Sequence, residues 1–184
     1  MLTRIKNKLT IALKDLTVSD QRAIDPPPVG MFVKGINLGG EALVIEGNGW
    51  ESYADALNQG LAVPHAYTLE TWVQPISPHA PPNLRRMLNT VIFWRETVEL
   101  TQALPNGTYD IYLWNIENYQ TNWHSLAFRL NGQVVETAVQ LTLGEWRRHG
   151  AYRIAITDGC LHVSVSTDNP ELDSHLMGIS IYKV

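Results

Sequence analysis

Short apolar runs that alternate with polar positions recur along the chain from residue 29 to residue 184. A period of two places successive side chains on opposite faces and is typical of β-strands with one buried face. Asn-Gly and Asp-Gly pairs lie between several of these runs and favour tight hairpin turns. The predicted strands cover residues 42–46, 91–101, 108–117, 125–130, 152–157, 161–166 and 177–183. Regularly spaced strands with turns between them predict an all-β fold, an antiparallel β-sandwich of the jelly-roll type.

Three segments depart from the strand pattern. Residues 50–59 predict a short helix, because Glu51 and Asp55 lie one helical turn apart. Residues 74–84 are rich in proline and predict a long surface loop. Apolar residues spaced by three and four predict an amphipathic helix near the N-terminus, and a proline triplet at 26–28 ends it. We therefore predict an N-terminal helical extension with a proline-rich linker over residues 1–28 and a sandwich domain over 29–184.

Composition narrows the function classes. The 184 residues suit one domain, and the N-terminus lacks the long apolar stretch and cleavage site of a signal peptide. Fourteen basic and 18 acidic side chains give a net charge of −4, which argues against a nucleic-acid partner. A lone cysteine, Cys160, excludes an intramolecular disulfide and a multi-cysteine zinc site. No apolar run is long enough to span a membrane. The chain is rich in Trp and Tyr, with six and seven residues.

The strand 108–117 and the loop after it carry the most informative aromatic residues. Alternation places Tyr112 and Trp114 on the face opposite the presumed core face, and Tyr119 and Trp123 lie in the following loop. The loop also contains amides, among them Asn118 and Asn122. A flat ring packs on the C–H face of a sugar while amides hydrogen-bond its hydroxyls, so the pattern points to glycan binding. The alternative is that Tyr112 and Trp114 pack in the core or in an oligomer contact.

Other residues with chemical potential give weaker signals. A pair of carboxylates could support glycoside hydrolysis, and the candidates are Glu41, Glu46, Glu51 and Asp55. The loop 168–175 offers carboxylate and amide oxygens, which suit Ca²⁺, although the pattern favours a plain solvated turn. A second aromatic cluster is expected to pack in the core, and its members are Trp50, Tyr53, Tyr67 and Trp72. Trp94 and Trp146 lie at strand edges, where we also expect packing.

The serial order of several segments resembles the malectin-like members of the galactose-binding-like β-sandwich group. The segments that carry the resemblance are residues 36–40, 106–113, Glu117, 126–132, 156–161 and 175–182. The resemblance implies a galactose-binding-like sandwich that binds glycans through aromatic and acidic residues, in some members with a structural calcium ion. Positions that could play these parts here are Trp114, Tyr119 and Trp123, with Asp168 or Asp173 as the acidic partner.

These observations favour a non-catalytic carbohydrate-binding module that recognises an oligosaccharide or polysaccharide. The predicted ligand-binding residues are Tyr112, Trp114, Tyr119, Trp123, Asn118, Asn122, Asp168 and Asp173. A glycan partner favours an extracellular or cell-surface location. One alternative is an interaction or assembly domain that uses the aromatic face within a homo-oligomer or a multidomain parent. A second alternative is a small glycoside hydrolase that uses a carboxylate pair.

Overall fold

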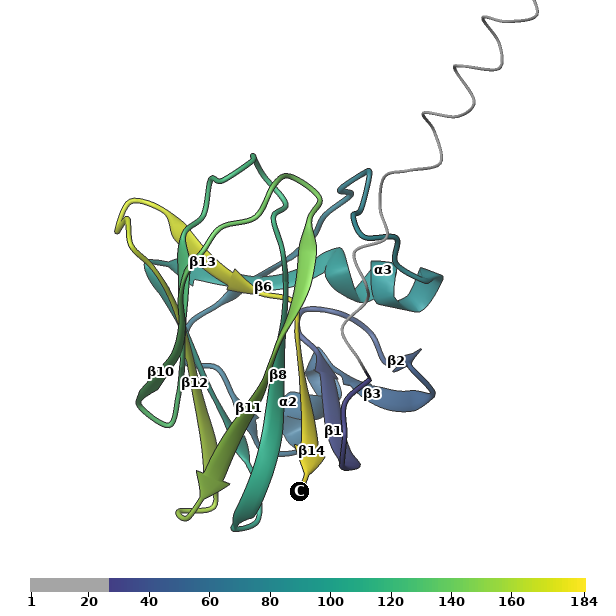
Figure 1. Cartoon of the computed structure of the whole chain (residues 1–184), viewed down its shortest axis with the longest axis vertical. Coiled ribbons are helices and arrows are strands. Elements are labelled where there is room, and N and C mark those ends of the chain that lie inside the picture. Colours follow the sequence, from purple (N-terminus) through teal and green to yellow (C-terminus); the bar gives the residue numbers. More distant parts are fainter. Residues whose placement is uncertain (1–26) are drawn as a thin grey trace, which may run out of the picture.

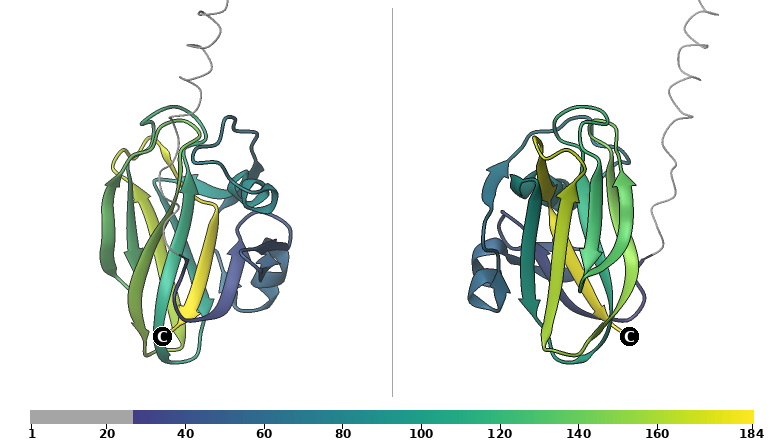
Figure 2. Two further views of the ribbon diagram at one scale, coloured as in Figure 1. Left: turned by 45° about the vertical axis from the view of Figure 1, so that its right-hand side comes forward. Right: turned by 90° about the vertical axis from the view of Figure 1, so that its left-hand side faces the viewer.

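Alternation along the strands gives each of two sheets an apolar face. The two apolar faces pack against each other and form a β-sandwich (Figures 1 and 2). The computed structural model describes residues 27–184. The first sheet has six strands in the order β11-β8-β14-β1-β3-β2. Their bounds are Trp146–Ile156 for β11, Gly107–Ile116 for β8, Gly178–Lys183 for β14, Met31–Asn37 for β1, Asn48–Ser52 for β3 and Leu43–Ile45 for β2.

The second sheet has five strands in the order β10-β9-β12-β7-β4, and a third, smaller sheet has the order β13-β6-β5. The bounds in the second sheet are Gln133–Val139 for β10, Leu126–Leu130 for β9, Cys160–Thr167 for β12, Thr97–Ala103 for β7 and Leu61–Ala62 for β4. In the third sheet they are Asp173–Leu176 for β13, Thr90–Arg95 for β6 and Tyr67–Glu70 for β5. The helices are α2, Tyr53–Asn58, and α3, Pro82–Leu88. The predicted antiparallel β-sandwich is confirmed, although β1 and β3 pair in parallel.

Strand β8 is buried on both faces. Its residues Tyr109, Ile111 and Leu113 belong to the core between the two sheets. Trp114 on the opposite face belongs to a second core, which α3 and its neighbouring segments contribute to. There its ring lies 5.7 Å from the ring of Trp50 and 5.8 Å from that of Trp146. Aromatic residues therefore occur on both faces of β8 because each face packs into a different core.

The burial of Tyr112 and Trp114 corrects the role predicted for these two aromatic residues. Trp114 is 1% exposed, and Tyr112 is also buried. The guanidinium carbon of Arg148 lies 5.5 Å from the ring centre of Tyr112 and 5.4 Å from that of Trp114. Neither ring forms an exposed platform for a ligand, because side chains of the same chain already cover both.

Local backbone conformation explains where predicted and observed elements differ. The predicted strand 91–101 divides into β6 and β7 at Glu96, whose φ of 63° lies in the left-handed region. The predicted helix 50–59 is shorter, because Trp50 belongs to β3 and Ser52 caps α2 by accepting from the Asp55 amide at 3.0 Å. The end of the predicted loop 74–84 lies in α3, which tolerates Pro82 in its first turn.

Other expectations at the N-terminus lie outside the described residues. The predicted helical extension falls almost wholly on residues 1–26. Within residues 27–184, no helix combines the length and the apolar character needed to cross a membrane.

Candidate functional site

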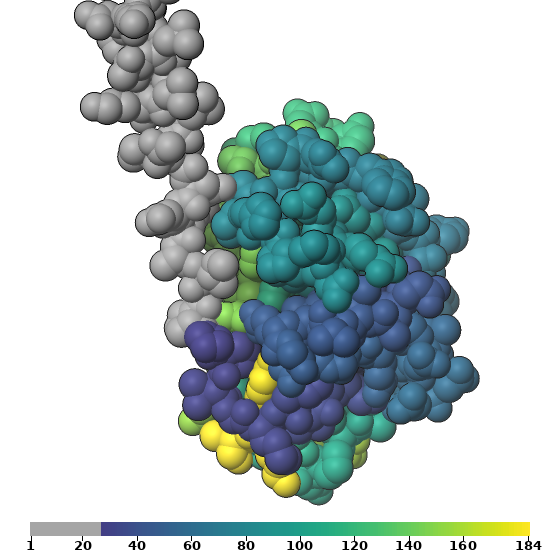
Figure 3. All heavy atoms as spheres, turned by 90° about the vertical axis from the view of Figure 1, so that its right-hand side faces the viewer, coloured from purple at the N-terminus to yellow at the C-terminus, as the bar shows by residue number. Residues whose placement is uncertain are grey.

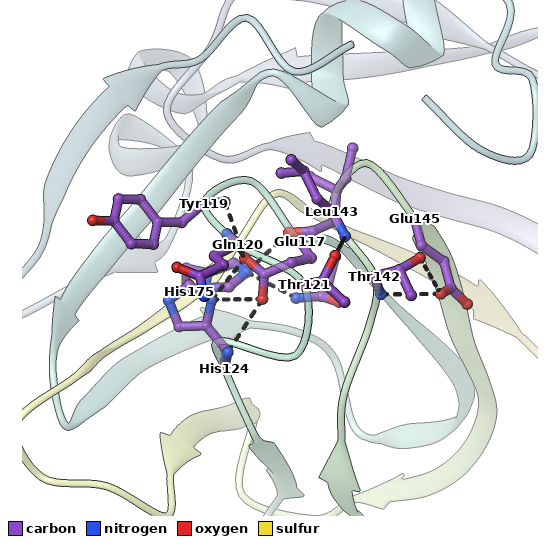
Figure 4. A network of polar contacts seen from close by, with 11 residues as sticks. Glu117, Tyr119, Gln120, Thr121, His124, Thr142, Leu143, Glu145 and His175 are labelled. Atoms are coloured by element: carbon purple, nitrogen blue, oxygen red, sulfur yellow. Dashed lines mark hydrogen bonds and ion pairs between the residues drawn. The ribbon is translucent and has the colours of Figure 1, made fainter. Parts of the chain in front are cut away.

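The loop that follows β8 is organised by the buried carboxylate of Glu117 (Figure 4). Its Oε1 accepts hydrogen bonds from the backbone amides of Tyr119 at 3.0 Å and Gln120 at 3.4 Å. Its Oε2 accepts from the backbone amide of His124 at 3.2 Å and lies 2.9 Å from Nδ1 of the same residue. Because an ionised carboxylate only accepts, Nδ1 of His124 carries a proton. One side chain therefore fixes both ends of the loop.

These hydrogen bonds keep Glu117 ionised. Burial alone would raise the pKa of Glu117, but the hydrogen bond from the His124 side chain and those from the backbone amides of Tyr119 and His124 outweigh it. The pKa therefore lies below its usual value. An ionised group at this position strengthens each of the hydrogen bonds that it accepts.

A second loop supports the first from its other side (Figure 4). The backbone amide of Asn122 donates to the carbonyl of Leu141 at 2.9 Å, and the amide of Leu143 donates to Oγ1 of Thr121 at 3.1 Å. Asn122 has a φ of 55°, a left-handed conformation that Asn tolerates better than most residues. The loop 118–124 is thus held by side-chain and backbone contacts along its length.

His175 on β13 lies beside His124. The two rings meet edge to face with their centres 4.4 Å apart. Nε2 of His175 lies 3.1 Å from the carbonyl oxygen of Ile116 and 3.0 Å from Nδ2 of Asn115. Burial, and then the proximity of His124, lower the pKa of His175 to about 4. His175 is thus a neutral ring at physiological pH.

The loop presents two aromatic rings at a cavity of about 300 Å³. Tyr119 is 66% exposed and Trp123 is 38% exposed, and their ring centres lie 5.0 Å apart with the planes tilted by 56°. Both rings line the cavity, together with Phe93 and Leu69 of the third sheet. The two rings contact each other and form a contiguous apolar surface, which is the kind of feature that can mark a binding site.

Polar side chains complete the wall of the cavity. Asn118, His124 and Asp173 line it, as does Glu171. Arg95 holds the two carboxylates, with its guanidinium nitrogens 3.7 Å from Glu171 and 3.5 Å from Asp173. The cavity therefore combines hydrogen-bond donors and acceptors with flat apolar surfaces.

The structure brings together four of the eight predicted ligand-binding residues. Asn118, Tyr119, Trp123 and Asp173 line the one cavity. The remaining four do not line it: Tyr112 and Trp114 are buried elsewhere, Asn122 shapes the turn, and Asp168 donates its backbone amide to the carbonyl of Ser125.

Sequence reasoning missed the histidines. His124 and His175 are 51 positions apart, so no local pattern joins them. Glu117 was considered only because of the family resemblance. A polar residue that ends an apolar strand could also have indicated a site here. Along one face of β8 the apolar residues Tyr109, Ile111 and Leu113 are followed by Asn115 and then Glu117, all of them buried.

The loop 168–175, whose oxygens suggested a possible calcium site, is held by contacts within the protein. Among residues 27–184, no three or more His, Cys, Asp or Glu side chains are grouped in a way that could hold a metal ion. Glu171 and Asp173 pair with Arg95, and the side chain of Asn169 accepts from the backbone amide of Glu171 at 3.0 Å. Glu171, Asp173 and Asn169 therefore have partners within the protein.

The carboxylates considered for hydrolysis are dispersed. Glu46 pairs with Arg148 at 3.1 Å, Glu51 pairs with Lys34 at 2.9 Å, and Asp55 accepts from the Ser52 hydroxyl at 2.7 Å. Glu41 lines a different hollow, beside α3. These contacts give three of the four a structural partner.

Comparison with known proteins identifies relatives by fold. No protein-family model and no curated protein matches the sequence. A calcium-binding mutant of Bacteroides uniformis β-glucuronidase 2 superposes with a TM-score of 0.67 and 14% identity, over 82% of this chain and 18% of that one. The extracellular domain of ANXUR1 from Arabidopsis thaliana gives a TM-score of 0.62 and 16% identity, over 83% and 48%. The plant receptor-like kinase ANX2 gives 0.64 and 15%, with the same coverage.

The chain thus spans less than half the length of each of these proteins. At such low identity the similarity shows the fold alone, a β-sandwich. This agrees with the sequence resemblance at the level of fold.

Proposed function

We propose that this domain is a non-catalytic carbohydrate-binding module that holds a glycan in the cavity lined by Tyr119 and Trp123. The observation that carries the proposal is the pair of exposed rings on a loop whose backbone is fixed by a buried carboxylate. A loop whose backbone is already fixed loses little conformational entropy when a ligand binds to its side chains, and this favours affinity. A sugar ring stacks its C–H groups on such a surface.

The polar wall suits hydroxyl groups. A hydroxyl both donates and accepts, so it needs partners of both kinds. The Asp173 carboxylate accepts, and the Asn118 amide does both. The His124 ring, held by Glu117, also lies in the cavity wall. The cavity volume lies at the lower end of the usual range for ligand pockets, which fits one or two sugar units.

The similarity to part of a β-glucuronidase and to a receptor ectodomain supports the proposal in a limited way. Domains with this fold occur in proteins whose names refer to glycan chemistry or to an extracellular location. We infer by analogy that this domain acts outside the cell, either attached to a larger protein or in an assembly. The aromatic face that suggested an assembly domain is not exposed to a partner, because side chains of the same chain cover Trp114.

The test is calorimetry against a panel of oligosaccharides with the variants Tyr119→Ala and Trp123→Ala. We expect wild-type dissociation constants between micromolar and millimolar, and a loss of about 1–2 kcal/mol of binding free energy in each variant. Tyr67→Ala is the matched control, because Tyr67 is 61% exposed and does not line the cavity. Unchanged affinity in both loop variants, or release of sugar from the panel by the wild type, would contradict the proposal.

A further inference from the structure

A third exposed ring lies outside the cavity. Trp72 follows β5 and is 81% exposed. Its position is nevertheless fixed on both sides: the Thr71 amide donates to the carbonyl of Asn89 at 2.7 Å, and the Val73 amide donates to Oδ1 of Asn89 at 2.9 Å. Val73 itself is buried in the second core. The backbone around Trp72 is therefore anchored while its indole projects into solvent.

Trp72 lies between two hollows. One, of about 300 Å³, has Trp72 and Leu143 in its wall and shares Asn118 and Tyr119 with the proposed glycan cavity. The other, of about 510 Å³, lies beside α3 and shares Trp72 and Gln74 with the first. Shared walls place the three hollows in a row, which begins at Trp123 and ends at α3. The side of the molecule that carries α3 faces the viewer in Figure 3.

The hollow beside α3 contains unused hydrogen-bonding groups of both kinds. Its wall includes Arg85 and Arg86 on α3, together with Glu41 and Glu70. Among residues 27–184, none of these four side chains forms an ion pair. Guanidinium groups donate and carboxylates accept, so the set matches neutral sugar hydroxyls better than it matches a single charged group. Equal numbers of positive and negative groups argue against a strongly charged ligand.

We propose that the glycan site extends from the cavity past Trp72 to α3, so that the domain binds several consecutive units of a linear, neutral oligosaccharide chain. Trp72 is the second stacking platform, and Tyr119 lies at the junction between the cavity and the middle hollow. This inference rests on the proposed function, because it describes the length of the same site. It assigns the ligand to the interior of a chain and not to a single terminal sugar.

Chain length is the variable that tests the extension. We would titrate the wild type by calorimetry with cello-, laminari-, malto-, xylo- and chito-oligosaccharides of two to six units, and with oligogalacturonides as an acidic series. In the series that binds, affinity should rise by about tenfold or more from two units to six. The neutral series should bind more tightly than the acidic one.

The variant Trp72→Ala should remove most of that gain and leave the affinity for the two-unit ligand unchanged. Tyr119→Ala should weaken binding at every length, and Tyr67→Ala should leave binding unchanged at every length. The double variant Arg85→Ala/Arg86→Ala gives an independent readout at the far end and should weaken only the longest ligands.

The outcomes separate the two proposals. Equal affinity for two and six units, or an equal effect of Trp72→Ala at both lengths, would overturn the extension and leave the cavity proposal intact. Tighter binding of the acidic series would overturn the neutral assignment. Failure of every series to bind the wild type would contradict the proposed function and, with it, the extension.

Discussion

The side chain of Glu117 shows how one buried charge shapes a surface. A carboxylate removed from water is costly unless it is hydrogen-bonded, and here it accepts three backbone amides and one imidazole N–H. The same bonds define the path of the loop that presents Tyr119 and Trp123. The position of the exposed rings thus follows from the need to satisfy a charge beneath them.

His175 makes the stability of the domain depend on pH. Its pKa is about 4 in the folded protein and roughly 6.5 in an unfolded chain. The unfolded state therefore binds more protons below pH 6.5, and stability should fall between about pH 6.5 and 4, by on the order of 3 kcal/mol. We expect urea denaturation at pH 7 and pH 4.5 to show most of this loss for the wild type and a smaller loss for His175→Asn.

The control is His162→Asn, because the side chain of His162 is half exposed. That variant should keep the wild-type dependence on pH. The account of His175 is wrong if His175→Asn loses as much stability as the wild type over the same interval. Glu117 contributes in a different interval, because its lowered pKa means that its contribution is lost only at a pH below about 4.5.

At the level of elements, β8 connects the two cores of the domain. Its inward residues fill the space between the sheets, and Trp114 on the other face packs under α3 and its neighbours. The sequence pattern could not distinguish this arrangement from an exposed aromatic face. The covering residues, among them Leu84 and Met87, precede Trp114 by about 30 positions.

Substitution of Trp114 separates packing from binding. Because its ring is fully buried, Trp114→Ala should lower the free energy of unfolding by about 3–5 kcal/mol. Trp72→Ala, which removes a ring of the same size from the surface, should change it by less than about 0.5 kcal/mol. Chemical denaturation measures both. A stable Trp114→Ala variant that loses glycan binding would restore the role that the sequence suggested for this residue.

The same long-range packing explains which elements were predictable. Strands β8, β9 and β12 follow from local alternation and from turn residues, and they were predicted to within one or two residues. Helix α3 was missed because its first residue, Pro82, ends a proline-rich segment, and proline is acceptable only at the start of a helix. The edge strand β5 was missed because it has only four residues, too short a run for the alternation of Tyr67 and Leu69 with polar residues to indicate a strand.

At the scale of the whole molecule, the sandwich brings distant segments together at one site. The cavity receives residues from β5, β6, the loop after β8 and the segment around β13. The sequence could predict Tyr119 and Trp123 as surface rings, because they lie in a loop rich in amides. It could not predict that Phe93 and His175 join them, since strand order in the third sheet is set by pairing across about 80 positions. Asp173 was predicted at this site only as the acidic partner that the family resemblance implied.

The solved structures that share the fold are much longer than this chain, which covers 18% of one and 48% of another. Such folds host many functions, so the site has to carry the functional argument. Here that argument depends on where a glycan contacts the surface.

The most direct test is a two-dimensional NMR titration of the isotope-labelled protein with the panel oligosaccharide that binds most tightly. We predict that the indole signal of Trp123 and the amide signals of residues 118–124 and 171–173 shift, while the indole signals of Trp50 and Trp114 stay in place. Shifts confined to Thr101, Arg129 and His162, which line a separate hollow of about 360 Å³ over β7, β9 and β12, would contradict the account.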